Sequence, residues 1–278
     1  MSNIQFLKKK ATEIRIDILR MVCNAKGGHI GGSLSCVDIL VALYYGVLKI
    51  DPRNPQWEER DRFLLSKGHG VEGYYAVLAH KGFFPMEELQ TYRKYGSRLI
   101  AHPTLKVPGI EMNTGALGHG LSMGVGMALA AKMDHKKNKV YVLMGDGELD
   151  EGSVWEAAMA GSQFQLDNLV GIVDRNNLQM SGETEKIMKL ESLKEKWSSF
   201  GWSVKEINGH DIKQLIQNFK DIPISAGKPN LFLANTTKGY GISFMQNQTK
   251  WHHKVPDAEQ LTQALKELEC RFEEVEKE

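Results

Sequence analysis

Two short clusters of glycine and polar residues follow apolar runs of the chain and could together bind a metal and a phosphate. Gly145-Asp146-Gly147 follows the apolar run 140–144, and Asn176-Asn177-Leu178 follows the run 169–173. Because the carboxyl ends of parallel strands meet at one edge of a sheet, we expect the clusters to lie together. Glycines let backbone N–H groups approach a phosphate, and carboxylate and amide oxygens suit Mg²⁺. The stretch predicts a site for a diphosphate cofactor.

Four histidines lie in or beside glycine or proline turns: His29, His69, His102 and His252. Histidine is the side chain whose charge changes near neutral pH, so such a set could transfer protons. One isolated histidine is more often a structural residue, but that explanation fits four similar positions poorly. No pair of histidines has the helical spacing, with cysteine or carboxylate support, that is typical of zinc sites. We expect His80, His135 and His210 to be ordinary surface or helix-capping residues.

The segment from Gly68 to Gly73 also matches the Gly-x-Gly-x-x-Gly fingerprint of dinucleotide-binding folds. That fingerprint requires an acidic residue after a second strand, about 20 residues further on, to bind a ribose hydroxyl. The sequence offers no such residue there, and a histidine occupies a variable position of the fingerprint. We therefore disfavour a dinucleotide site.

The elements that must position these residues alternate between strands and helices. Apolar spacing predicts a helix over 8–25 and strands over 62–66, 140–144, 169–173, 202–207 and 231–235. Capping-box spacing of Ser35 with Asp38, and of Ser153 with Glu156, predicts two helix starts. The alternation predicts a doubly wound, mostly parallel α/β sheet flanked by helices, in one domain over residues 1–278.

Two further segments carry expectations of their own. Residues 96–118 form a long glycine- and proline-containing loop that carries His102, and loops of such length are often functional. A helix is expected to start at Pro256-Asp257, with an apolar stripe spaced by four and three residues. That stripe either packs on the chain's own core or contacts another subunit.

Composition excludes several classes of protein. The net charge is +1, which gives no electrostatic reason to expect nucleic acid or an anionic membrane as a partner. The apolar segment 121–131 is much shorter than the roughly 20 residues of a membrane span. Three cysteines without Cys-x-x-Cys spacing favour a reduced, cytoplasmic chain over a disulfide framework.

Taken in order, the polar segments resemble the N-terminal half of transketolase, including its motif for thiamine diphosphate and Mg²⁺. The resemblance covers almost the whole chain, and it implies the thiamine diphosphate-binding fold, specifically its diphosphate-binding domain. The segments that carry it are Gly28-His29-Ile30-Gly31-Gly32-Ser33-Leu34, Ser66-Lys67-Gly68-His69, Ala101-His102-Pro103, Thr114-Gly115-Ala116-Leu117-Gly118-His119-Gly120, Gly145-Asp146-Gly147, Glu151-Gly152, Asn176-Asn177, Thr236-Thr237-Lys238-Gly239 and His252.

The resemblance implies roles for individual residues. Mg²⁺ would be bound by Asp146, Asn176 and the carbonyl of Leu178. The diphosphate would be bound by Gly147, His69 and His252, and the cofactor rings would contact Gly115 and Leu117. His29 and His102 would face the reacting ketose, and Glu151 would join an acidic network that reaches the partner domain's activating glutamate.

This sequence departs from the family pattern at three points. Ala116 and His119 alter the usual Gly-Pro-Leu-Gly-Gln-Gly loop. His253 stands where glycine usually follows the last histidine, so either His252 or His253 could be the diphosphate ligand. The residues also end where the family's pyrimidine-binding half would begin.

We therefore expect the N-terminal subunit of a split transketolase, inactive alone and active with a separate C-terminal, pyrimidine-binding subunit. The expected assembly is a heterotetramer with two copies of each chain, which transfers a two-carbon ketol unit from a ketose phosphate to an aldose phosphate in carbohydrate metabolism. Pentose phosphates are the default substrates, and a branched or unusual ketose phosphate is open. Three alternatives remain: a subunit like deoxyxylulose phosphate synthase, one like a 2-oxo acid dehydrogenase component, and a non-catalytic module.

Overall fold

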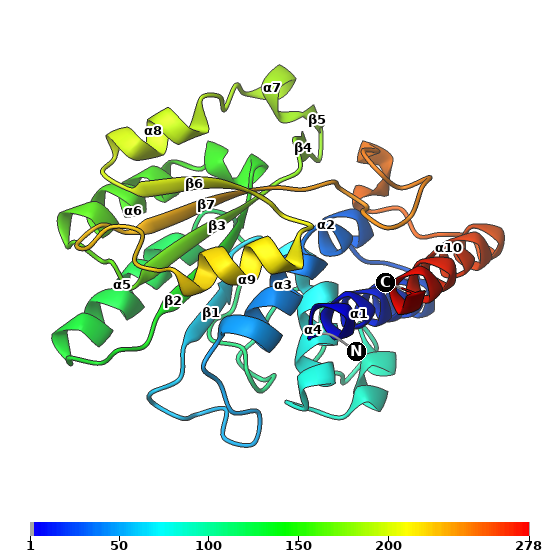
Figure 1. The fold of residues 1–278 in the computed structure, drawn as a ribbon. Coiled ribbons are helices and arrows are strands. Elements are labelled where there is room, and N and C mark those ends of the chain that lie inside the picture. Colours follow the sequence, from blue (N-terminus) through cyan, green and yellow to red (C-terminus); the bar gives the residue numbers. More distant parts are fainter. Residues whose placement is uncertain (1–2, 278) are drawn as a thin grey trace.

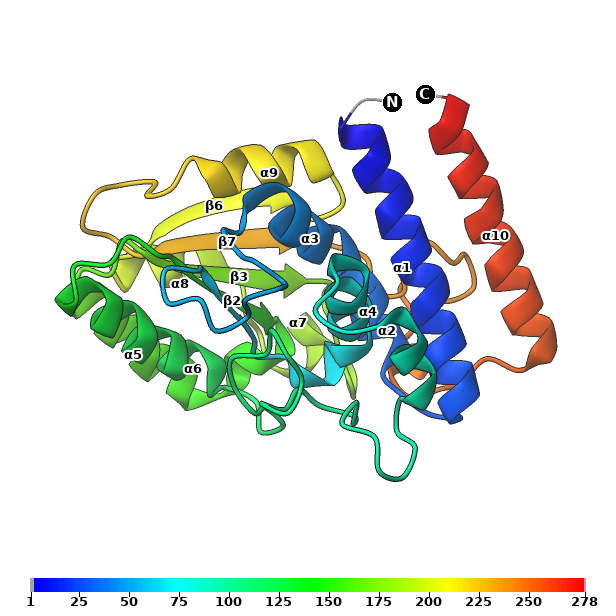
Figure 2. The ribbon, with the colours of Figure 1, turned by 90° about the horizontal axis from the view of Figure 1, so that it is seen from below.

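A five-stranded parallel sheet forms the centre of the molecule in the computed structural model, which describes residues 3–277 (Figures 1 and 2). Its strands are β1 (Arg62–Leu65), β2 (Val140–Gly145), β3 (Leu169–Arg175), β6 (Ser203–Asn208) and β7 (Asn230–Asn235). Their spatial order is β1-β2-β3-β7-β6, and every neighbouring pair is parallel. The predicted parallel α/β sheet is therefore confirmed.

Helices cover both faces of this sheet (Figure 2). One face carries α5 (Gly120–Met133), α6 (Gly152–Gln163) and α8 (Leu193–Ser199), and the other carries α3 (Val37–Ala42) and α9 (Ile212–Lys220). Beyond the sheet lie α1 (Asn3–Ala25), α2 (Ile30–Ser35), α4 (Val71–Lys81) and α10 (Ala258–Lys277). The remaining elements are α7 (Thr184–Ile187), the hairpin β4 (Leu178–Gln179) with β5 (Gly182–Glu183), a π-helical turn at Leu43–Val47, and 3₁₀ turns at Gly68–Gly70, Met86–Thr91, Gly147–Asp150 and Thr249–His252.

The strand sequences are continuously apolar because both faces of the sheet are buried. In β2, Val140, Val142 and Met144 pack into the core beneath α5 and α6, whereas Tyr141 and Leu143 pack into the opposite core. Alternate side chains of a strand point to opposite faces, so one run of apolar residues supplies two cores. Close helix packing at this sheet requires a small residue at Gly124, where a Cβ would lie 2.6 Å from a Val142 methyl.

The two helices expected from capping-box spacing do form, as α3 from Val37 and α6 from Gly152, but neither Ser35 nor Ser153 caps its helix. The first helix after the glycine loop begins at Ile30, and the Ser35 hydroxyl donates to Asp174 at 2.6 Å instead of capping a helix. In α6 the residue before the first turn is Glu151, and the Ser153 hydroxyl donates to the Gly118 carbonyl at 2.9 Å. In both cases the serine hydroxyl donates to a residue that is distant in the sequence, and the local spacing of residues does not predict such a contact.

The C-terminal helix packs on the chain itself. α10 runs alongside α1, and the two ends of the described chain lie close together (Figure 2). Ala264, Leu268 and Val275 are buried there, and Leu261 and Leu265 pack against the main core. The apolar stripe predicted for this helix therefore lies against the protein's own core. Among the described residues no helix is both long and apolar enough to cross a bilayer.

A buried ion pair joins the carboxyl ends of the strands. The Lys67 ammonium, after β1, contacts the Asp174 carboxylate in β3 and donates to the Gly32 carbonyl at 2.8 Å. Asp174 also accepts from the hydroxyls of Ser35 and Thr236, the latter just beyond β7. Despite the burial of Asp174, the Lys67 charge and these hydrogen bonds lower its pKa. The pair connects the segments that build the site described below.

Replacing Asp174 by asparagine should destabilise the protein by about 3–5 kcal/mol, because it leaves the buried Lys67 charge without its partner. Chemical denaturation with the linear-extrapolation analysis measures this loss. The double variant Lys67→Met, Asp174→Asn should recover part of it, and Asp221→Asn, at an exposed position, should stay within about 0.5 kcal/mol of the parent. A single variant as stable as the parent would contradict a structural role for the pair.

Candidate functional site

A cavity of about 370 Å³ opens at the carboxyl edge of the sheet. It is lined by turns that follow β1, β2, β3 and β7 and by the loops around residues 29, 102 and 252. The structure brings together all of the predicted site residues except one: His29, His69, His102, Gly115, Leu117, Asp146, Gly147, Asn176, Leu178 and His252 line this cavity. Glu151 is exposed and lies outside the cavity lining.

Oxygen donors form one end of the cavity. The Asp146 carboxylate is held by the backbone N–H of Gly147 at 2.8 Å and that of Asn177 at 2.6 Å, and by the Arg175 guanidinium at 3.2 Å. Burial raises the pKa of Asp146, and the nearby Asp174 charge adds to this effect. A carboxylate, the Asn176 amide and the Leu178 carbonyl together are the hard oxygen set that Mg²⁺ prefers. These residues therefore fit a magnesium ion.

A lysine that the sequence reasoning missed lies beside this oxygen set. Lys238 is 2% exposed, and its ammonium donates to the Leu178 carbonyl at 3.0 Å and lies 3.1 Å from His252 Nδ1. Burial, and secondly the Lys67 charge, lowers the pKa of Lys238 to about 8. A buried ammonium beside metal-binding oxygens can bind an anion that bridges both, as a diphosphate does. Lys238 lies just beyond β7, at the same edge of the sheet as Asp146. This position in the sequence, directly after a predicted strand, could have indicated that it belongs to the site.

The glycine loop at residues 115–118 is fastened to the sheet by Glu148. This buried carboxylate accepts from the N–H groups of Gly118 at 2.9 Å and Gly145 at 3.0 Å, and it contacts the Ser66 hydroxyl. Gly118 has φ +80°, and a Cβ there would lie 2.6 Å from Glu151 Cβ, so a side chain fits poorly. Around Gly115 a Cβ would meet nothing within 4 Å, which leaves room for a ligand against this wall.

Histidines form the other end of the cavity. The His29 ring lies 5.6 Å from His69, 6.0 Å from His102 and 5.5 Å from His252, measured between ring centroids. Glu72 fixes the His29 loop, because its carboxylate accepts from the His29 N–H at 2.8 Å and the Ser33 hydroxyl at 2.6 Å. Two buried polar atoms of the lining, His29 Nδ1 and Gln179 Oε1, have no hydrogen-bond partner among the described residues. Such atoms suit hydrogen bonds to a bound ligand.

Burial keeps these imidazoles neutral near pH 7. It lowers the pKa of His29 to about 4 and of His252 to about 3, with neighbouring cationic groups adding to the effect. Burial also lowers the pKa of His69 well below its usual value. A neutral imidazole has one donor and one acceptor nitrogen, so it can take up or release a proton. The cluster therefore suits proton transfer to and from hydroxyl groups.

These lowered pKa values predict a loss of stability in acid. Between about pH 6.5 and pH 4 the unfolded chain binds protons that folded His29 and His252 do not, so stability falls as pH falls. Urea unfolding at pH 7 and at pH 4.5 should show the loss, and His252→Asn should make it smaller. If the variant and the parent lose stability equally, buried neutral histidines do not explain the dependence.

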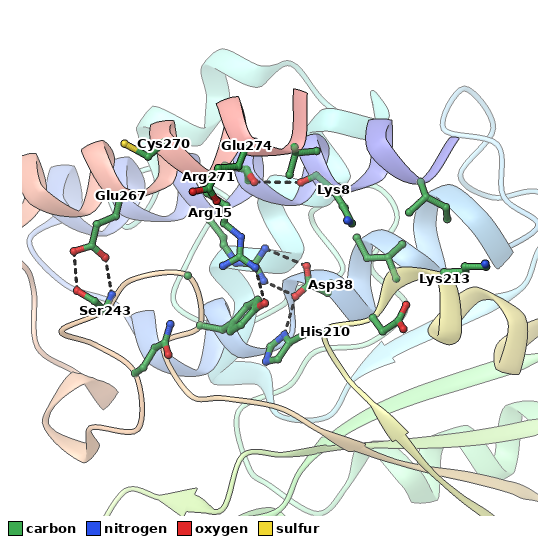
Figure 3. Close-up of a pocket in the computed structure, with 18 residues that line it drawn as sticks. Lys8, Arg15, Asp38, His210, Lys213, Ser243, Glu267, Cys270, Arg271 and Glu274 are labelled. Carbon is green, nitrogen blue, oxygen red and sulfur yellow. Dashed lines mark hydrogen bonds and ion pairs between the residues drawn. The ribbon is translucent and has the colours of Figure 1, made fainter. Parts of the chain in front are cut away.

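A second cavity, of about 640 Å³, lies elsewhere, between α1, α9 and α10 (Figure 3). Its floor is a hydrogen-bonded chain: Arg15 pairs with Asp38 at 2.6 Å, Asp38 contacts His210 Nδ1 at 2.8 Å, and His210 Nε2 accepts from the Thr237 N–H at 2.9 Å. His210, expected to be an ordinary surface or capping residue, thus anchors the segment that carries Lys238. The hydrogen bonds at the floor of this cavity therefore help to position Lys238 in the cavity at the carboxyl edge of the sheet.

Comparison with known proteins finds relatives over nearly the whole chain. The family model described as "Transketolase, thiamine diphosphate binding domain" matches residues 7–274. The chain is 52% identical over 275 residues to an apulose-4-phosphate transketolase subunit of Phocaeicola vulgatus, with 99% of this chain and 98% of that protein covered. It is 44% identical over 264 residues to the 6-deoxy-6-sulfo-D-fructose transketolase subunit SqwG of a Clostridium species, covering 95% and 96%.

A solved structure shares the fold. The transketolase of Campylobacter jejuni matches with a TM-score of 0.91 and 31% identity, and the match covers 99% of this chain and 46% of that one. The chain therefore spans slightly less than half of that transketolase, but nearly the full length of the two proteins that are named as subunits.

Proposed function

Because this chain belongs to the transketolase family, through its thiamine diphosphate binding domain, we propose that it is the diphosphate-binding subunit of a split transketolase. The observation that carries the proposal is the single cavity in which the Mg²⁺-type oxygens, the buried Lys238 and the neutral histidines meet. We propose that residues 1–278 form one domain of this fold, and that the chain acts in the cytoplasm, where its free cysteines stay reduced.

In this proposal the oxygen-rich end of the cavity would hold the metal, and the diphosphate would lie between that end and the histidines. Asp146, Asn176 and the Leu178 carbonyl bind Mg²⁺, and Gly147, His69 and His252 bind the diphosphate. Lys238, whose ammonium donates to the Leu178 carbonyl, would neutralise the negative charge of a diphosphate held beside it. Gly115 and Leu117 contact the rings of the cofactor. Thiamine diphosphate, when bound, supplies the carbanion chemistry, while the chain positions it.

His29 and His102 act on the sugar. Their rings lie 6.0 Å apart, measured between centroids, and both line the cavity. As neutral groups they bind substrate hydroxyls and move protons on and off oxygens as the ketol unit is detached and passed on. Glu72 fixes the backbone of His29, which lies on a different loop from His102.

The partner supplies what this cavity lacks in the proposal: the glutamate that activates the aminopyrimidine ring, and most of the sugar-phosphate contacts. Glu151, exposed beside the Gly118 loop, is placed to join an acidic network with that glutamate. We propose a heterotetramer with two copies of each chain and with the cofactor at the interfaces between them.

A phosphorylated or sulfonated ketose is the proposed donor, and an aldose phosphate is the acceptor. The relative at 52% identity is named for apulose-4-phosphate and the one at 44% for 6-deoxy-6-sulfo-D-fructose, so both compounds join pentose phosphates among the substrates to test. We place apulose-4-phosphate first, because the protein named for it is the more similar of the two.

The decisive experiment combines this chain with a candidate pyrimidine-binding partner. With Mg²⁺ and thiamine diphosphate, the pair should transfer a ketol unit from one member of a panel of ketose donors, and each chain alone should not. Robust turnover by the isolated chain would exclude the split enzyme. Release of CO₂ from pyruvate by the pair would favour a deoxyxylulose phosphate synthase-like or 2-oxo acid dehydrogenase-like subunit instead. If calorimetry on the pair shows no Mg²⁺-dependent cofactor binding, a non-catalytic module would be favoured.

A further inference from the structure

A fifth imidazole, that of His253, lies at the histidine end of the cavity and completes a cluster of three nitrogens there. His253 lies 4.3 Å from His29 and 4.7 Å from His252 between ring centroids. One nitrogen from each of His29, His252 and His253 can be chosen so that all three lie within 4.8 Å of one another. These residues are distant in sequence, and only the fold brings position 29 against positions 252 and 253.

The donor atoms of this cluster differ in kind from those at Asp146. Three imidazole nitrogens without a carboxylate suit zinc and the neighbouring first-row metals, whereas Mg²⁺ prefers oxygen. We propose that His29, His252 and His253 form a binding site for a divalent transition metal of the zinc type, separate from the magnesium site. Three protein nitrogens leave one tetrahedral position for water or an exchangeable ligand.

The geometry allows the site to close with small side-chain movements. Zinc–nitrogen bonds of about 2.0–2.1 Å place tetrahedral nitrogens roughly 3.3 Å apart. His253 is exposed, so its ring can rotate toward its neighbours. His29 Nδ1 has no hydrogen-bond partner among the described residues, so no contact there holds the ring in its present orientation. The spacing of histidines argues against zinc only for pairs that are close in the sequence. It does not apply to this cluster, because its histidines come from two segments that are distant in the sequence.

The surroundings set an upper limit on affinity. Lys238 approaches His252 Nδ1 at 3.1 Å, so His252 Nε2 is the nitrogen available to the metal, and the ammonium repels a cation. Metal-binding histidines usually donate their second N–H to a carboxylate or carbonyl, and losing such support costs about 10- to 100-fold in affinity. We expect binding that is weaker by about that factor than at a fully supported three-histidine site.

A metal at this site would shut the sugar end of the cavity. It would occupy nitrogens of His29 and His252, which the proposed function assigns to the ketose and the diphosphate. This consequence rests on the proposed function, whereas metal binding by the three imidazoles does not. Zinc would then act as an inhibitor that competes with the sugar substrate and with the diphosphate of the cofactor.

The test is a titration of the untagged full chain with Co²⁺ in excess Mg²⁺, read by visible absorption. Four-coordinate Co²⁺ absorbs far more strongly than the hydrated ion, so the readout requires no enzyme activity. We expect one equivalent to bind and Zn²⁺ to displace it. His253→Ala should weaken binding by more than 10-fold, and so should His29→Asn. The matched control His135→Asn, which removes an exposed histidine elsewhere, should bind Co²⁺ like the parent.

A second control separates this site from the magnesium site. Asp146→Asn should leave the Co²⁺ absorption unchanged, although it removes a proposed Mg²⁺ ligand. The inference is overturned if the parent gives no absorption of four-coordinate Co²⁺, if His253→Ala binds Co²⁺ like the parent, or if Asp146→Asn abolishes the signal. A failed transketolase assay changes none of these readouts, so the two proposals can fail independently.

Discussion

Replacing Asp146 by asparagine should lower the affinity of the paired subunits for thiamine diphosphate by at least about 100-fold. Asp146 is the only carboxylate in the proposed magnesium set, and asparagine keeps its shape while removing its charge. Even residues that merely support metal ligands are worth 10- to 100-fold in affinity, so a direct ligand should be worth no less. Calorimetric titration of the cofactor into the complex at fixed Mg²⁺ measures the change.

The fold should tolerate this substitution. The asparagine oxygen can still accept one of the N–H groups that now bind Asp146, and Arg175 keeps Glu185 and Glu191, each at 2.9 Å. Asp150→Asn, at an exposed position in the same turn, is the matched control and should bind cofactor like the parent. Unchanged cofactor affinity in folded Asp146→Asn would place the metal elsewhere.

The position of the site was predictable because it depends on where strands end. β2 and β3 are parallel, with Gly145 opposite Asp174, so their terminal clusters must share one edge of the sheet. The apolar runs that mark these strands are visible in the sequence because both faces of the sheet are buried. The glycines of the turns are visible too, and together these features predict a site for a metal and a phosphate at this edge, whereas the family resemblance implies the roles of His69, His252 and Leu178.

Contacts between distant segments were not predictable in the same way. Nothing near Ser35 indicates that its hydroxyl will contact Asp174, and nothing near His210 indicates a bond to the Thr237 N–H. Lys238 stands in a segment that carries the family resemblance but received no role, because only the fold buries it between His252 and Leu178. Local patterns thus predicted where the proposed ligands lie, whereas the residues that hold them in place required the tertiary structure.

The same burial gives Lys238 opposite effects on stability and on binding. In the protein without ligand, its ammonium is out of water and its pKa is lowered to about 8, so the charge is unfavourable there. Lys238→Met replaces it by an apolar side chain of similar length, which should leave stability unchanged or raise it. Beside a bound diphosphate the charge is favourable, and losing one member of a buried ion pair costs about 2–5 kcal/mol.

We therefore expect Lys238→Met to bind thiamine diphosphate about 30- to several thousand-fold more weakly in the complex, without a lower unfolding temperature for the chain. Parent affinity should also fall as pH rises above about 8, because Lys238 loses its proton, and the variant should lack this dependence. Calorimetry across pH, with Lys250→Met as the exposed control in the following segment, measures both effects. If Lys238→Met lowers both the stability of the chain and its affinity for the cofactor, Lys238 is a structural residue that acts through its hydrogen bond to the Leu178 carbonyl.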